Sequence, residues 1–196
     1  MSKIDLNALR DRAYKIACEH GFHDNKLSNE HCLMLVITEL SEAVEADRKG
    51  KRSDVESYKL LSTASKERTG NLNYFNEVSF RHHVKDTVED ELSDAVIRLL
   101  DLAGLRNIDI EDFTEEDIED LSESCNDETF TESIYAISIL PKKTELEYNY
   151  KLGKQLNYML LAIFGLAKHL NIDLMWHIEQ KMKYNELREK MHGKKY

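Results

Sequence analysis

The chain has 196 residues and a formal net charge of −10, and this length suits one compact domain with a sizeable core. The acidic balance excludes general nucleic-acid binding, which needs a basic surface, although a single nucleotide needs only a few local cations. One proline and seven glycines leave few turn signals for a β-architecture. Segments rich in Leu, Glu, Lys and Ala favour helices instead. The expected fold is all-α, in a single domain over residues 1–196.

Cysteine usage and hydropathy indicate the compartment. Cys18, Cys32 and Cys125 are widely separated and form no CxxC motif, which is typical of a reducing environment. The N-terminal MSKIDLNALRDRAYK lacks the apolar core of a signal peptide. The longest apolar stretch, Met159–Ala167, is too short to cross a bilayer. We therefore expect a cytoplasmic protein without a membrane-spanning segment.

Apolar residues that recur every three or four positions predict six helices. They are expected at 4–20, 28–48, 78–105, 129–139, 145–170 and 173–191. In the fifth helix, apolar residues from Leu152 to Leu170 alternate steps of four and three. This spacing indicates a bundle seam, which can lie inside the chain or between two subunits.

Two polar stretches separate these helices. Residues 48–77 form a polar insertion with four lysines and three arginines. Long loops in compact domains are usually functional or disordered, so this stretch either closes over an anionic substrate or is a solvated insertion with a short helix near 53–65. The acidic stretch 108–128 is expected to be a solvated helix-loop segment that links the two halves.

A faint internal repeat is also present. LLDLAGLRNIDI at 99–110 matches IFGLAKHLNIDL at 163–174 with a constant offset. At that offset Glu91 corresponds to Gln155 and Asp94 corresponds to Tyr158. Residues 129–170 are therefore interpreted as an extra or duplicated helical hairpin that lacks the acidic pair. A chance match between two amphipathic helix ends is the alternative.

Two acidic pairs carry most of the functional information: Glu39-x-x-Glu42 and Glu91-x-x-Asp94. Residues three apart lie on one helix face, so two such pairs on facing helices would gather four carboxylates. Like charges this close need a counter-charge, and oxygen ligands favour Mg²⁺. Ordinary solvent-facing helix charge is the alternative, but both pairs flank apolar stripes. Glu89 falls inside such a stripe and requires a partner.

The segments ITELSEAVEA and VEDELSDAVIRLLDLAG resemble the ExxE…ExxD signature of the all-α nucleoside triphosphate pyrophosphohydrolases. This superfamily includes MazG-like proteins, dimeric dUTPases and phosphoribosyl-ATP pyrophosphatase. The C-terminal IEQKMKYNELREKMHGKKY adds a second match, because MazG-like chains tend to carry K-x3-N-x2-R followed by HGK. Here these positions are Lys181, Asn185, Arg188 and His192-Gly193-Lys194. The matching blocks cover about half of the chain, in the order found in the family.

The resemblance implies a helical bundle that hydrolyses a nucleoside triphosphate to monophosphate and pyrophosphate with Mg²⁺, for which Mn²⁺ can substitute. Glu39, Glu42, Glu91 and Asp94 would hold the metal, and Glu39 or Glu42 would also activate the attacking water. The substrate-binding residues would be Lys181, Asn185 and Arg188. From the residues alone, a solvated basic helix end is the favoured interpretation of Lys181 and Arg188, and the resemblance reverses that preference. The resemblance also implies a homo-oligomer, with a dimer favoured.

Three departures from the family pattern leave points open. The insertion lengthens the gap between the two acidic helices, the C-terminal block follows the 145–170 helix, and Thr38 stands where many members have another glutamate. The number of metals and the water-activating carboxylate are therefore undetermined. A dUTPase-like or phosphoribosyl-ATP pyrophosphatase-like enzyme is an alternative. A non-catalytic helical regulator that binds nucleotide or metal is another.

Overall fold

The computed structural model describes residues 5–69 and 72–190, and within them the chain forms helices and no strand. The helices are α1 (Leu6–Glu19), α2 (Asn29–Arg48), α3 (Val55–Thr69), α4 (Leu72–His83), α5 (Val88–Leu105), α6 (Glu115–Glu123), α7 (Phe130–Tyr148), α8 (Leu152–His169) and α9 (Leu174–Glu186). The expectation of an all-α fold is confirmed.

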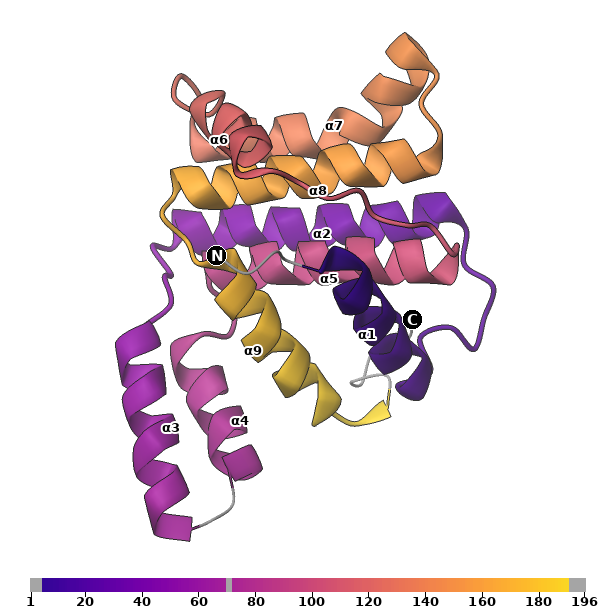
Figure 1. The fold of residues 1–196 in the computed structure, drawn as a ribbon. Helices are drawn as coiled ribbons and strands as arrows, with labels where there is room; N and C mark the ends of the chain where they lie inside the picture. The colour runs from indigo at the N-terminus through magenta and orange to yellow at the C-terminus, as the bar shows by residue number, and fades with distance from the viewer. Residues whose placement is uncertain (1–4, 70–71, 191–196) are drawn as a thin grey trace.

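Helices α2 and α5 run side by side through the middle of the molecule (Figure 1). The α7–α8 hairpin, with α6 packed on α8, covers one side of this pair, while α1 and α9 pack on the other side. The α3–α4 hairpin projects from one end and contacts α9. The acidic pairs predicted from sequence therefore lie on the two central, neighbouring helices.

The apolar seam of α8 is part of the core within one chain. Leu156, Met159 and Ile163 are fully buried, and α8 packs against α5, α6 and α7. The spacing allowed a seam inside one chain or between two subunits, and in the structure this seam lies inside the chain. No single helix among the described residues has the length and apolar composition needed to cross a membrane; α8 and α9 have them only as a pair, and this pair is bent by 114°.

The predicted single helix at 78–105 is wrong. Helix α4 ends at His83 and α5 begins at Val88. Between them, Asp86 adopts a left-handed conformation with φ of 60°, and the Thr87 side chain accepts a hydrogen bond from the Asp90 N–H as an N-cap. A threonine N-cap starts a new helix because its hydroxyl satisfies a free backbone N–H of the first turn.

The predicted break between 139 and 145 is also wrong. Helix α7 continues through Pro141 and ends at Tyr148. A proline inside a helix removes one backbone hydrogen bond, but Ile137 before it and Thr144 after it are both buried. Packing on α8 thus keeps the helix continuous. It ends where Asn149 takes a left-handed conformation with φ of 53°.

Residues 48–77 are largely helical, in α3 and the start of α4, and α3 is longer than the short helix expected near 53–65. The base of this insertion is closed by a hydrogen bond of 2.8 Å from the Asp54 N–H to the His83 carbonyl. Phe80 of α4 stacks on Tyr184 of α9, with ring centroids 4.6 Å apart. The insertion is therefore a helical arm packed against α9.

The internal repeat corresponds to two helix ends of the same form. Asn107 after α5 and Asn171 after α8 both adopt left-handed conformations, with φ of 52° and 56°. The next residue in each case donates its N–H to an alanine carbonyl, at 2.9 Å for Ile108 and 2.8 Å for Ile172. Such ends satisfy free carbonyls and tolerate asparagine, so the matching letters coincide with the same end chemistry at both helices.

Candidate functional site

Three of the four predicted carboxylates come together between α2 and α5. One oxygen from each of Glu39, Glu91 and Asp94 lies within 4.8 Å of the others. Glu39 and Glu91 are each 4% exposed, and Asp94 is half-buried. Glu39 is drawn inward because its neighbour on α2, Leu40, is completely buried at the contact with α5.

Two cations lie against this cluster. The Lys181 ammonium, from α9, is 2.8 Å from both carboxylate oxygens of Asp90 and 2.7 Å from Asp94 Oδ2. The Arg98 guanidinium, from α5, donates to Glu39 Oε1 through Nε. The cluster is thus made of the carboxylates of Glu39, Asp90, Glu91 and Asp94 with the cations of Lys181 and Arg98; we call it the acidic centre.

The acidic centre has two negative charges in excess when all its carboxylates are ionised, since four carboxylates face two cations. A divalent cation would balance this excess. Opposite oxygen ligands of Mg²⁺ are about 4.2 Å apart, given bonds of about 2.1 Å. The separations of up to 4.8 Å therefore need only small side-chain shifts. The donor set of oxygens, its charge and its spacing fit Mg²⁺.

Burial perturbs the protonation of these groups. Burial, with the nearby charges of Asp94 and Asp90, raises the pKa of Glu91 to about 9. Burial also raises the pKa of Asp90 to about 6, although Lys181 opposes this shift. Burial alone would lower the pKa of Lys181, but Asp90 and Asp94 outweigh it and the net shift is upward. At neutral pH, Asp90 and Lys181 form a charged pair while Glu91 holds a proton that a cation would displace.

Glu42, the fourth predicted ligand, lies in a different position. It is exposed and lines a pocket of about 250 Å³ on the outer side of the acidic centre, together with Glu91. Lys49 and Lys51 line the same pocket, as do two further carboxylates, Glu45 and Asp86; Lys49 pairs with Glu45 at 3.0 Å. We call this the lysine pocket, and it gives solvent access to Glu91.

A second pocket, of about 100 Å³, adjoins the acidic centre on its other side and is lined by residues of α1, α2, α5 and α9. Asp94 and Arg98 lie on its boundary, so it opens directly beside the cluster. The predicted substrate residues Asn185 and Arg188 also line it. Most of its surface is apolar and includes the following side chains: Ala13, Ile16, Ala17, Phe22, Leu27, Cys32, Leu35 and Ile97. We call it the apolar pocket.

Two buried polar atoms on residues of the apolar pocket have no hydrogen-bond partner within the described part of the chain: His23 Nδ1 and Asn185 Oδ1. The other ring nitrogen of His23, Nε2, is 2.7 Å from Asp101 Oδ1. Burial raises the pKa of Asp101, although His23 opposes this shift. Buried polar atoms normally have partners, and these two are suited to hydrogen bonds with a ligand.

The structure adds four residues to the site predicted from the sequence, and one predicted group of residues lies outside the described part of the chain. Asp90, Arg98, His23 and Asp101 were not singled out, since their partners come from distant segments. The one available signal was the i,i+4 spacing of Asp94 and Arg98, which places a cation one turn beyond the acidic pair. The HGK group at 192–194 lies outside the described residues.

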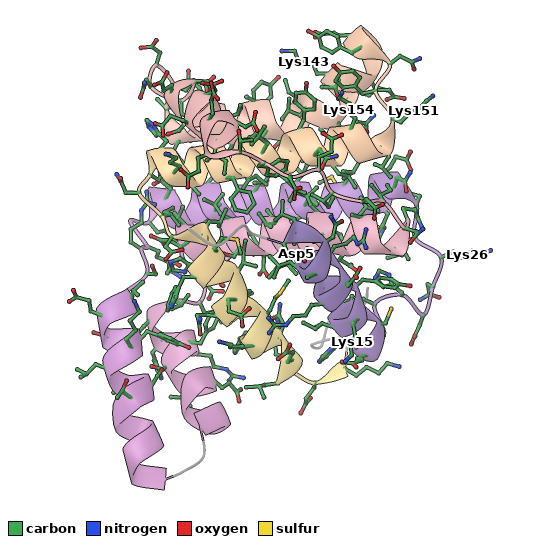
Figure 2. The ribbon with its side chains drawn as sticks, viewed as in Figure 1. Asp5, Lys15, Lys26, Lys143, Lys151 and Lys154 are labelled. Atoms are coloured by element: carbon green, nitrogen blue, oxygen red, sulfur yellow. The ribbon has the colours of Figure 1, made fainter. Side chains whose placement is uncertain are left out.

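Glu89, whose burial required a partner, has one: its carboxylate accepts the Ser53 N–H at 3.1 Å. The lysines that Figure 2 labels on the α7–α8 hairpin and its connecting turn, namely Lys143, Lys151 and Lys154, are not part of the acidic centre.

Compared with known protein families, with curated proteins and with solved structures, the chain gives no match.

Proposed function

We propose that this protein is a Mg²⁺-dependent hydrolase that converts a nucleoside triphosphate to the monophosphate and pyrophosphate. The observation that carries the proposal is the acidic centre, whose carboxylates outnumber its cations by two and which lies between the apolar pocket and the lysine pocket. This arrangement suits a ligand with an aromatic ring at one end and phosphates at the other. The all-α pyrophosphohydrolase fold implied by the ExxE…ExxD motif is part of the same proposal, and so is a homo-oligomeric, dimer-forming state.

Glu39, Glu91 and Asp94 would hold the cation, since their oxygens lie together. Bound Mg²⁺ would orient the triphosphate and neutralise charge that develops on its phosphate oxygens. Glu42 is better placed than Glu39 to position the attacking water, because Glu42 is exposed in the lysine pocket whereas Glu39 is buried against Arg98.

The remaining residues would bind the substrate. The apolar pocket would take the base, with hydrogen bonds to His23 Nδ1 and Asn185 Oδ1, which have no partner among residues 5–69 and 72–190. Lys49 and Lys51 would contact the outer phosphates from the wall of the lysine pocket. Lys181 and Arg188 would contact phosphate oxygens nearer the cation.

The proposal is tested by incubating the protein with a panel of ribo- and deoxyribonucleoside triphosphates and Mg²⁺, and by separating the products by chromatography. We expect monophosphate and pyrophosphate from at least one substrate. Glu91→Gln should lower this turnover by about 100-fold or more, because it removes a proposed metal ligand. Glu116→Gln, on an exposed position of α6, is the control and should leave turnover unchanged.

Two results would count against the proposal. Production of diphosphate and phosphate would mean that a different phosphoanhydride bond is cleaved. Absence of turnover with either Mg²⁺ or Mn²⁺ across the whole panel would favour the non-catalytic regulator, in which Lys181 and Arg98 serve as permanent counter-charges for the carboxylates.

A further inference from the structure

The most deeply buried carboxylate of the acidic centre is Asp90, which is 1% exposed. Both of its oxygens accept hydrogen bonds from the Lys181 ammonium at 2.8 Å. Its Oδ2 also accepts the Asp86 N–H at 3.0 Å. With both oxygens held, the Asp90 carboxylate is fixed in orientation, and it lies next in sequence to the proposed ligand Glu91.

Lys181 connects this buried carboxylate to the proposed metal site. Its Nζ is also 2.7 Å from Asp94 Oδ2, and its remaining surroundings include the ring of Phe80, with Nζ 5.6 Å from the ring centroid. A lysine side chain has four flexible carbons and three N–H donors. Without Asp90, the ammonium would be free to pair with Asp94 alone, on the oxygens that a cation would use.

We infer that Asp90 is a positioning residue that holds the Lys181 ammonium beside Asp94, so that a divalent cation can take an Asp94 oxygen while Lys181 stays within reach of a phosphate oxygen. The inference rests on the proposed function for its last step, the contact with phosphate. Its first step, the control of cation binding at Asp94, requires only the geometry of the acidic centre.

A purely structural role explains the Asp90–Lys181 pair poorly. Replacing a buried ion pair with apolar residues is often neutral or stabilising, because two charges must be desolvated. The preceding residue, Glu89, shows that a buried carboxylate on this turn does not need a lysine: it is 8% exposed and accepts a backbone N–H from Ser53. Asp90 and Glu89 are thus adjacent buried carboxylates, of which only Asp90 holds a cation.

The first test is calorimetric titration of the full chain with Mg²⁺ alone. Asp90→Asn should weaken Mg²⁺ binding by about tenfold or more, as loss of a group that orients a ligand does in metal sites, because Lys181, which already contacts Asp94 Oδ2, then loses its two bonds to the Asp90 carboxylate and pairs with Asp94 more strongly. Lys181→Met should tighten binding, since a competing cation is removed. The double variant should bind Mg²⁺ as tightly as Lys181→Met does, because Asp90 acts only through Lys181. Glu89→Gln is the matched control and should bind Mg²⁺ as the wild type does.

Kinetics with the substrate found in the product screen provide the second test. Asp90→Asn should lower kcat by about 10- to 100-fold with a small change in KM, because the ammonium acts mainly on charge that develops in the transition state. Asp90→Glu, which keeps the charge, should recover part of kcat. Melting temperatures of all variants identify effects that come from stability alone.

The inference is overturned if Asp90→Asn matches Glu89→Gln in both Mg²⁺ affinity and kcat, even when its melting temperature falls. Should Asp90→Asn not fold, Lys181→Met carries the test: unchanged Mg²⁺ affinity would contradict the competition between lysine and cation. Absence of turnover in the wild type would refute the proposed function, whereas the Mg²⁺ titration would still decide whether Asp90 controls the site.

Discussion

Helices α5 and α8 have similar lengths, burial and C-terminal turns, but their buried polar side chains differ in charge. Each has 18 residues, of which most are buried, and each ends in a left-handed asparagine followed by isoleucine. In α8 the buried polar side chains are amides with backbone partners. Gln155 donates to the Tyr150 carbonyl at 2.8 Å and Asn157 accepts the Glu111 N–H at 3.0 Å. In α5 the buried polar side chains are mostly carboxylates.

This difference shows where the molecule retains uncompensated charge. Neutral amides inside α8 are satisfied within the protein and require no ligand. The four carboxylates of the acidic centre outnumber their two cations, and one negative charge stays in excess even while Glu91 keeps its proton. Desolvated like charges are unfavourable unless a further cation balances them. Helix α8 therefore stabilises the fold, whereas α5 is where we expect ligand binding at a cost in stability.

The largest loss of stability is expected when a buried carboxylate, of the kind found in α5, is introduced into α8. Gln155→Glu would replace a donor by a carboxylate, 8% exposed, beside the Tyr150 carbonyl, while Lys142 and Lys151 line the pocket next to it. We expect a loss of about 2 kcal/mol in the free energy of unfolding at pH 8, because a buried carboxylate would face the Tyr150 carbonyl acceptor and could not donate to it. Urea denaturation measures it, with Glu147→Gln on the exposed end of α7 as control. A loss below about 1 kcal/mol would mean that α8 tolerates charge as α5 does.

The reverse exchange, Glu91→Gln, should stabilise the cation-free protein. The folded pKa of Glu91 is raised to about 9, whereas an unfolded glutamate loses its proton near pH 4.3. The folded state therefore binds the extra proton between these values, and the stability that Glu91 contributes falls as pH rises through this window.

Denaturation in EDTA should thus show Glu91→Gln more stable than the wild type by roughly 2 kcal/mol at pH 8, a difference that shrinks toward pH 5. Added Mg²⁺ should stabilise the wild type and leave the variant unchanged. A variant less stable than the wild type at pH 8 would indicate that Glu91 is already well compensated by its neighbours.

The smallest effects are expected at the shared helix ends. Asn107→Ala and Asn171→Ala each force an alanine into a left-handed conformation, which should cost about 1 kcal/mol. The two losses should be equal, and neither variant should change the thermal shift produced by Mg²⁺. Thermal unfolding with and without Mg²⁺ measures both quantities. A loss confined to one site would show that the two ends are alike in sequence but not in energetics.

Sequence reasoning was most successful where information is local. The all-α class and the positions of α1, α2 and α9 follow from periodic apolar residues. Glu39, Glu91 and Asp94 follow from spacing on one helix face. The break before α5 was missed because the periodicity of 78–105 is unbroken, although Thr87 is a good N-cap. Near Pro141 a helix break was predicted that the structure does not have, since packing on α8 outweighs one lost hydrogen bond.

The rest of the acidic centre depends on long-range contacts. Lys181 meets Asp90 across 91 residues of sequence, and no local pattern specifies that pairing. Sequence also cannot separate Glu42 from Glu39, because both lie on the same side of α2; the packing of α5 buries only Glu39. The apolar pocket needs four helices at once, so the roles of His23 and Asp101 become visible only in three dimensions.

The most direct test of the account is a crystal structure grown with Mn²⁺, with the ion located by its anomalous signal. We predict a peak at about 2.2 Å from oxygens of Glu39, Glu91 and Asp94, with Lys181 still held by Asp90. A peak confined to other carboxylates, or Asp94 still bound only to Lys181 at saturating Mn²⁺, would contradict a metal site between α2 and α5.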